Sequence, residues 1–412
     1  MMERIWNLDS IGILCDETDA AQHRFVLDNF NTSIQLKNDR YSVALPWKPV
    51  VSMQDNKHIA EKRLSQVTRR LTNSQGLMAR YDAAIREYLV SGVAENVTQE
   101  MDLAQNTAYI YYMPHHAVIR EDRITTKVRI VFDATSHEAG TSSLNDNLNA
   151  GPNLNPDIMP LLMNFRLYPV VLVSDVQKAF LQIAIHEDDR DALRLLWYST
   201  TPVDGQLLPN VETWRMTRVT FGTAPSTFLL AATLQHHIQR HASEHPRLAR
   251  ILENSIYVDD VIFGAANEEE AAEMYTETLQ LFGKASMKLQ KWGSNSYAMR
   301  EKFKSEPAAV LIGNTTKVLG IPWNQEQHTL SLPLDFQRAS GEYNGMTTKR
   351  QVLRSVAQIY DALGFILPYT VTRKMLLQEI WKHGLEWDAP LPDDLARKWA
   401  VVAQRAPGSQ RH

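Results

Sequence analysis

Apolar residues recur at helical spacing through residues 57–91, with Arg and Lys between them, and this pattern predicts a helical zone that Gly76 interrupts and Gly92 ends. Similar patterns predict further helices around Trp6, over residues 225–242, 267–283, 347–363 and 368–383, and after Pro392. Strand-like runs are predicted at residues 41–45, 109–113, 116–120, 127–133 and 169–175, and within 190–221 and 284–325. The mixture predicts an α+β protein.

One apolar run contains two adjacent acids. Ile256 to Phe263 is hydrophobic on both sides of Asp259 and Asp260, which predicts a β-hairpin with the acids at its tip. Neighbouring carboxylates repel, and their burial without a partner is costly. A bound Mg²⁺ would remove that cost, because it prefers carboxylate oxygens. The alternative is an ordinary solvated turn.

A second acid ends a buried strand. Residues 169–174 form a continuous apolar run that leads into Asp175, which is either the N-cap of the next turn or a ligand. A turn at Gly222 then precedes a helix, and the hairpin of Asp259 and Asp260 follows. Three carboxylates from two adjacent strands could hold two Mg²⁺ ions about 3.5–4 Å apart, an arrangement that supports phosphoryl transfer.

Other candidate features admit plainer explanations. Lys127 and Arg129 fall on one face of a predicted strand, which suits phosphate binding or a solvated strand face. The basic helical region between Thr347 and Trp387 is either a solvated face or a surface that tracks a nucleic-acid backbone. The pairs His115-His116 and His236-His237 are not expected to bind metal, because adjacent side chains point in different directions.

The composition narrows the class of protein to which this chain can belong. The chain has 412 residues, enough for two or three domains, and a net charge of -4, so any nucleic-acid contact must come from local basic patches. Its single cysteine, Cys15, excludes an internal disulfide framework and a cysteine-based zinc site. There is neither a signal-peptide pattern nor a membrane-length apolar run, so we expect an intracellular, cytoplasmic protein with no membrane partner.

The order and spacing of these motifs resemble the palm of reverse transcriptases, specifically of BEL/Pao-type long-terminal-repeat retrotransposons, over nearly the whole chain. The resemblance is carried by Tyr257-Val258-Asp259-Asp260 (the YxDD box), residues 173–180 (the first catalytic motif), 219–225 (the template-contacting motif), 127–134 (the fingers hairpin) and 318–321 (the primer grip). Residues 41–47, 289–292, 378–381 and 387–388 are similar to the BEL/Pao group in particular. The chain departs from the pattern in three places: Asp133-Ala134-Thr135 stands where the fingers motif often has Arg after Asp and an aromatic residue, Phe221 replaces the retroviral Gln, and Ala362 stands in place of Pro.

The resemblance implies roles for individual residues. The metal ligands would be Asp175, Asp259 and Asp260, with the carbonyl of Val176 as a further one, for two Mg²⁺ ions that Mn²⁺ could replace. The nucleotide-binding residues would be Arg129 and Lys127 at the triphosphate, Phe180 as a gate against the ribose 2′-OH, Phe221 and Gly222 at the nascent base pair, and Lys288 as the acid for pyrophosphate. The primer and template would contact Tyr257 and Gly320.

The implied architecture is a right-hand polymerase with fingers, a palm built on an antiparallel sheet, and a partial thumb or connection. Its expected domains are an N-terminal extension (1–56), a helical segment and fingers (57–168), the palm with a fingers insertion near 188–218 (169–332), and a truncated thumb or connection (333–412). Without a complete protease, ribonuclease H or integrase, the chain would be a fragment of a Pol polyprotein or a degenerate gene copy.

The implied activity is RNA-directed DNA synthesis, in which a primer on an RNA or DNA template is extended with dNTPs. Two alternatives remain open: a relic that only binds nucleic acid, and an RNA-copying RNA polymerase, against which Phe180 argues.

Overall fold

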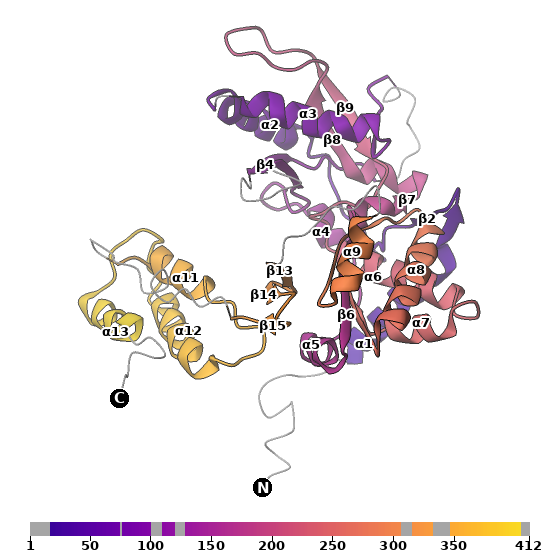
Figure 1. Cartoon of the computed structure of the whole chain (residues 1–412). Helices are drawn as coiled ribbons and strands as arrows, with labels where there is room; N and C mark the ends of the chain where they lie inside the picture. Colours follow the sequence, from indigo (N-terminus) through magenta and orange to yellow (C-terminus); the bar gives the residue numbers. More distant parts are fainter. Residues whose placement is uncertain are drawn as a thin grey trace. The chain divides into compact units, whose positions relative to one another are not determined.

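A computed structural model describes residues 17–74, 76–99, 109–119, 128–305, 315–332 and 347–404. The helix predicted around Trp6, and Lys127, lie outside these residues. The chain divides into two compact units. The first contains residues 1–155, 175–259 and 274–290, and the second contains residues 156–174, 260–273 and 291–412. The fold is a mixture of helices and strands, as predicted (Figure 1).

The helices are α1 (Glu17–Ser33), α2 (Lys57–Thr72), α3 (Leu77–Val90), α4 (Leu144–Asn147), α5 (Ile158–Leu167), η2 (Ala179–Gln182), η3 (Glu187–Leu193), α6 (Ser226–Arg240), α7 (Pro246–Leu252), α8 (Glu268–Gly283), α9 (Tyr297–Lys304), α11 (Lys349–Ala357), α12 (Leu367–Lys382) and α13 (Asp393–Gln404), of which η2 and η3 are 3-10 helices. The strands are β1 (Gln35–Lys37), β2 (Arg40–Val43), β3 (Ala94–Asn96), β4 (His115–Ile119), β5 (Val128–Phe132), β6 (Val170–Val176), β7 (Ala184–Ile185), β8 (Arg194–Tyr198), β9 (Val211–Met216), β10 (Ile256–Tyr257), β11 (Asp260–Ala265), β12 (Leu289–Ser294), β13 (Thr315–Val318), β14 (Ile321–Asn324) and β15 (Thr329–Leu330).

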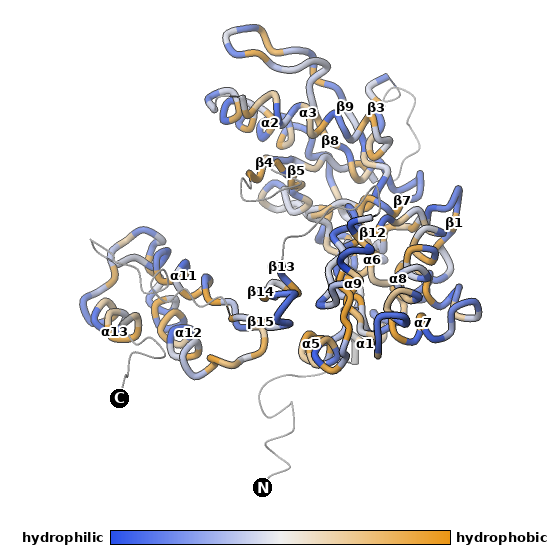
Figure 2. Tube along the Cα trace, viewed as in Figure 1, coloured by the Kyte–Doolittle hydropathy of each residue, from blue (hydrophilic) through white to orange (hydrophobic). Residues whose placement is uncertain are grey.

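The long helical zone predicted near the N-terminus is α2 and α3. Helix α2 buries Leu64, Thr68 and Leu71, which share one face, and Figure 2 shows its hydrophobic and hydrophilic residues interleaved. Gly76 separates the two helices with a φ of +70°, a left-handed conformation that suits glycine. The predicted break at this glycine is therefore confirmed.

Three small sheets complete the first unit. β4 and β5 form an antiparallel hairpin in which Val118 lies opposite Arg129. Along β5, Arg129 is exposed while Ile130 and Phe132 are buried, which confirms the predicted alternation. β8 and β9 form a hairpin and β3 pairs with the outer edge of β9; β2 lies between β1 and β7.

The strands that carry the aspartates belong to one four-stranded sheet with the order β10-β11-β6-β12. β6 is buried along its length except at Asp175, which is half-buried. The apolar run in the sequence thus forms an interior strand of the sheet. Asp175 is the one residue of this strand that is partly exposed.

Several predicted elements were wrong. Helix α1 was not predicted, because its described residues bury few apolar side chains, among them Val26 and Phe30. Helix α9 stands among predicted strands and begins at Ser296, whose side chain accepts a hydrogen bond from the backbone of Met299. Residues 109–113 form an isolated bridge rather than a strand. The helix predicted to reach residue 363 ends at Ala357.

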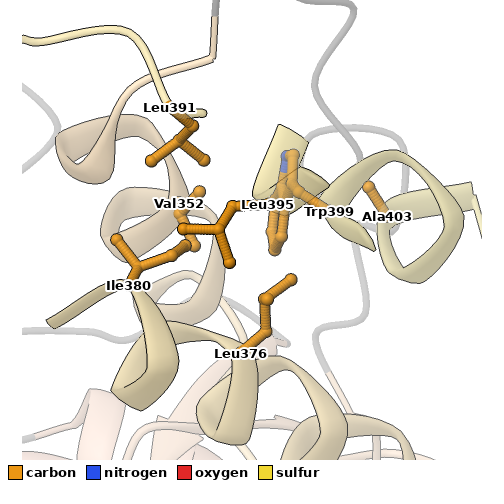
Figure 3. Packing of buried hydrophobic residues seen from close by; sticks show 7 residues of the cluster. All are labelled: Val352, Leu376, Ile380, Leu391, Leu395, Trp399 and Ala403. Carbon is orange, nitrogen blue, oxygen red and sulfur yellow. The ribbon is translucent and has the colours of Figure 1, made fainter. Parts of the chain in front are cut away.

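The C-terminal helices of the second unit have a core of their own. Val352, Leu376, Ile380, Leu391, Leu395, Trp399 and Ala403 pack together from α11, α12 and α13 and the residues between them (Figure 3). Beside this core the ammonium of Lys349 lies 4.4 Å and 4.9 Å from the ring centroids of Trp381 and Trp387. Part of the basic character predicted for this region therefore serves packing.

None of the helices in the described part of the chain combines the length and apolar character needed to cross a bilayer.

Candidate active site

The two adjacent aspartates lie at a tight turn. β10 and β11 are joined by Val258 and Asp259, and Asp260 is the first residue of β11. Val258 has a φ of +57°, a strained conformation for a β-branched residue. Its N–H donates a hydrogen bond of 2.9 Å to Oδ1 of Asn155, which holds the turn in place. The tip that presents Asp259 is therefore fixed from outside the hairpin.

The end of β6, which carries Asp175, contacts the turn that carries Asp259 through one backbone hydrogen bond within the first unit. The N–H of Val176, next to Asp175, donates to the carbonyl oxygen of Asp259 at 2.8 Å. The Nε2 of Gln290 donates to Oδ1 of Asp175 at 2.9 Å, which orients that carboxylate. Asp260 follows Asp259 directly in the chain as the first residue of β11.

Lys288 is held near the same strand end. Its carbonyl oxygen accepts a 2.8 Å hydrogen bond from the N–H of Gln177, two residues beyond Asp175. Lys288 is an exposed residue, so its ammonium group is accessible to an anion. The structure therefore gives Lys288 the access that a proton donor would need.

The two predicted aromatic residues touch each other. Phe180, in η2, is 5% exposed, and Phe221 is 52% exposed. Their ring centroids lie 4.4 Å apart with the planes tilted by 55°. Phe180 is thus covered partly by Phe221, and the exposed surface of the pair belongs mainly to Phe221.

Gly222 lies against the predicted fingers hairpin. It has a φ of +99°, and a Cβ built there would lie 2.3 Å from the carbonyl oxygen of Phe132 in β5. Asn145 clamps the turn: its Nδ2 donates to the carbonyl oxygen of Gly222 at 3.0 Å, and its Oδ1 accepts from the N–H of Ala224 at 2.7 Å. The absence of a side chain at residue 222 permits this contact with the strand that carries Arg129.

Gly222→Ala is expected to destabilise the protein by about 1–3 kcal/mol, because the φ is unfavourable for alanine and the nearest obstacle is backbone rather than a movable side chain. Denaturant unfolding followed by circular dichroism measures the change. Gly205→Ala is the control for conformation alone, since it has a φ of +73° with nothing within 4 Å of its Cβ position. Equal losses in both variants would show that the Phe132 contact contributes nothing.

Two of the remaining predicted residues are Tyr257 and Gly320. Tyr257 is half-buried in β10. Gly320 lies in the second unit, in the turn between β13 and β14, with a φ of +84° and the ring of Tyr360 over it. The hydroxyl of Tyr360 donates to the carbonyl oxygen of Leu319 at 2.6 Å. Lys127 lies outside the described residues.

The side chains of His, Cys, Asp and Glu are the usual protein ligands of metal ions. Within the described residues, no group of three or more of these side chains is arranged to hold a metal ion. His115 and His237 serve the core: each bonds a tyrosine hydroxyl, of Tyr81 and Tyr41, and a backbone carbonyl. Burial lowers the pKa of both imidazoles to about 4, so they are neutral at physiological pH.

Three residues that position the site were not predicted from sequence: Gln290, Asn155 and Asn145. Gln290 lies in the 289–292 run, which the resemblance singled out without giving it a role. The two asparagines fall between the predicted strands at residues 127–133 and 169–175, where no element was predicted. Their signal is the residue type, since Asn commonly bonds backbone groups in turns, but sequence does not reveal which turn each one meets.

Comparison with known proteins gives two kinds of likeness. Residues 348–411 match the family described as the Pao retrotransposon-like RNaseH-like domain. In structure, the chain resembles the foamy viral protease-reverse transcriptase in complex with an RNA/DNA hybrid, with a TM-score of 0.51, 14% identity, and coverage of 94% of this chain and 44% of that one. A structure of the foamy viral enzyme with dsDNA gives a TM-score of 0.46 at 14% identity, over 94% and 67% of the two chains.

The family match is confined to residues 348–411. The structural likeness, at 14% identity, concerns the fold, and the chain spans less than half (44%) of the length of the foamy viral chain. Among curated protein sequences, none matches this chain. The RNaseH-like description belongs to a segment whose described part consists mainly of α11, α12 and α13.

Proposed function

We propose that this chain is the polymerase part of a BEL/Pao-type Pol protein, an RNA-directed DNA polymerase that extends a primer with dNTPs. The observation that carries the proposal is the contact between the end of β6 and the turn of the hairpin: the N–H of Val176, next to Asp175, donates a 2.8 Å hydrogen bond to the carbonyl oxygen of Asp259. Two acids distant in sequence thereby share one strand end. The nucleic acids bound by the foamy viral enzyme support an RNA or DNA template as the partner.

The donor set agrees with Mg²⁺ in chemistry. Mg²⁺ commonly binds through one or two carboxylates and fills its other positions with water and substrate phosphates, and Asp175 and Asp259 are two acids at the point where the end of β6 contacts the hairpin turn. Asp260 and the carbonyl of Val176 are the proposed further ligands. Bound there, two such ions would activate the primer hydroxyl and stabilise the leaving pyrophosphate, and Mn²⁺ would substitute.

The chain's own residues would position the reactants. Gln290 fixes the direction of the Asp175 carboxylate through its 2.9 Å hydrogen bond. Exposed Arg129 and Lys288 would bind triphosphate oxygens, and Lys288 would protonate the pyrophosphate. Tyr257 and Gly320 would contact the primer strand. Phosphoryl transfer depends on such positioning and on charge rather than on covalent help from the protein.

Primer extension tests the proposal. The purified chain is given a labelled DNA primer on an RNA template and on a DNA template, with dNTPs and Mg²⁺, and in parallel with EDTA or with ribonucleotides. Metal-dependent extension with dNTPs is the expected result. Salt-sensitive binding of the duplex without extension would instead favour the nucleic-acid-binding relic, and extension with ribonucleotides would favour an RNA polymerase.

Phe180→Ala is expected to raise ribonucleotide incorporation relative to dNTPs by at least about tenfold, because removal of the ring opens space for a 2′-OH. The ratio of kcat/KM for rNTP and dNTP measures it. Since Phe180 packs against Phe221, Phe221→Ala is the matched variant: it removes the more exposed ring of the same pair. Equal relaxation in both variants would assign the effect to the aromatic pair, and an unchanged ratio in Phe180→Ala would refute the gate.

A further inference from the structure

A polar pocket lies in the first unit, and its lining contains none of the residues proposed above for catalysis or nucleotide binding. It has a volume of about 560 Å³. Its walls come from β1 and β2, from β7 and η3, and from the segment that follows β9. The cationic side chains among its lining residues are Lys37, Arg40, Arg190 and Arg218.

The guanidinium groups of Arg40 and Arg190 repel that of Arg218. Burial, together with the charges of Arg40 and Arg190, lowers the pKa of Arg218 to about 10. At physiological pH Arg218 is still charged, so folding holds like charges together. An anion in the pocket would offset that repulsion.

Carboxylates neutralise the guanidinium groups of the pocket only in part. Arg190 lies 3.3 Å from Glu95, which also pairs with Arg215 at 2.6 Å. Arg40 donates to the carbonyl oxygen and Oε1 of Gln182, which are uncharged acceptors. Among the described residues, no ion pair involves Arg218.

Two acids, Glu187 and Asp188, also line the pocket, but both are exposed residues. In the described part of the chain, neither of them forms an ion pair with Arg40 or Arg218. Exposed carboxylates interact weakly with cations because water and salt screen them. The lining therefore keeps a net positive charge, with Arg40 in β2 and Arg218 in the segment after β9, both of which pair with β7.

The pocket is large enough for more than one phosphate group. Its volume falls in the range of small-molecule sites, which are typically apolar, whereas this one is lined by guanidinium and other polar groups. Guanidinium groups bind phosphate oxygens in a forked geometry and remain charged. We propose that this pocket is an oligophosphate-binding site, which takes a run of phosphate groups either from a free oligophosphate or from a nucleic-acid backbone.

Isothermal titration calorimetry with inorganic tripolyphosphate, on the full chain in EDTA, tests the proposal. EDTA removes Mg²⁺, so the proposed polymerase site contributes little to binding. Saturable binding is expected, and Arg218→Gln should weaken it at least tenfold. Lys37→Gln, a change at an exposed lining residue, should weaken it less, and provides a second variant if Arg218→Gln does not fold. Arg24→Gln, at an exposed position in α1 outside the lining, should leave it unchanged.

Competition identifies the source of the phosphate. If tripolyphosphate displaces a labelled single-stranded oligoribonucleotide, and Arg218→Gln weakens the binding of both, the pocket takes a nucleic-acid backbone. If only tripolyphosphate binding depends on Arg218, the ligand is a free oligophosphate. Absence of saturable binding, or equal affinity in the wild type, Arg218→Gln and Lys37→Gln, overturns the site. Because no metal or nucleotide incorporation is measured, failure of primer extension would not affect this result.

Discussion

Asp259→Asn is expected to lower the rate of primer extension by at least about a hundredfold to a thousandfold, because it removes a charge that the reaction centre would need while it preserves shape. The fold should persist, since the contact to Val176 uses the backbone carbonyl of residue 259 and not its side chain. Single-turnover extension rates at saturating dNTP and Mg²⁺ measure the effect.

The matched control is Asp204→Asn. Asp204 is likewise an aspartate in the turn of a hairpin, between β8 and β9, but it is exposed and lies before a glycine with a φ of +73°. Its extension rate should equal that of the wild type. The affinity for the primer–template duplex should be similar in the wild type, Asp259→Asn and Asp204→Asn, because contacts to the phosphate backbone dominate nucleic-acid binding. Normal extension by Asp259→Asn would remove the acid pair from the mechanism.

The second large effect concerns stability. Asp191 is 1% exposed, and its Oδ1 and Oδ2 pair with Arg194 at 2.8 Å and with Arg215 at 3.1 Å. Asp191→Ala is expected to lower the free energy of unfolding by about 3–5 kcal/mol, because it leaves the buried guanidinium of Arg194 without its carboxylate. Chemical denaturation of the variant, with comparison of midpoint and slope, gives the value.

Two comparisons separate lost pairing from lost packing. The double variant Asp191→Leu with Arg194→Met should recover most of the stability, since replacement of both partners by apolar residues removes the isolated charge. Asp388→Ala breaks the exposed ion pair with Arg350 and should leave the midpoint unchanged. If Asp191→Ala also leaves it unchanged, the buried pair contributes no net stability.

Sequence reasoning recovered the elements whose pattern is strong on its own. The continuous apolar run before Asp175 becomes the buried strand β6, and the interleaved pattern of residues 57–91 becomes α2 and α3. Helix α1 was missed because few of its described residues face the core, so its sequence lacks an apolar stripe. Helix boundaries near residue 360 were misjudged because Asp361 accepts hydrogen bonds from the N–H groups of Phe365 and Ile366, and so holds a turn rather than a helix.

The candidate site shows a similar division. A carboxylate in an apolar setting stands out in a sequence, so Asp175, Asp259 and Asp260 could be named in advance. The residues that hold them could not, because Asn155 and Gln290 act through single long-range hydrogen bonds that leave no periodic trace. The oligophosphate pocket was also invisible, since Arg40, Arg190 and Arg218 are far apart in the chain.

The hydrogen bond from Gln290 to Asp175 joins a neutral amide to an acid, although Lys288 and Lys291 lie close by in the chain. An amide aims the carboxylate without cancelling its charge. A lysine at residue 290 would act as an internal counter-ion, tethered at high effective concentration and able to outcompete a dissolved cation for the same oxygen. The choice of glutamine thus orients this aspartate without placing a further positive charge at residue 290.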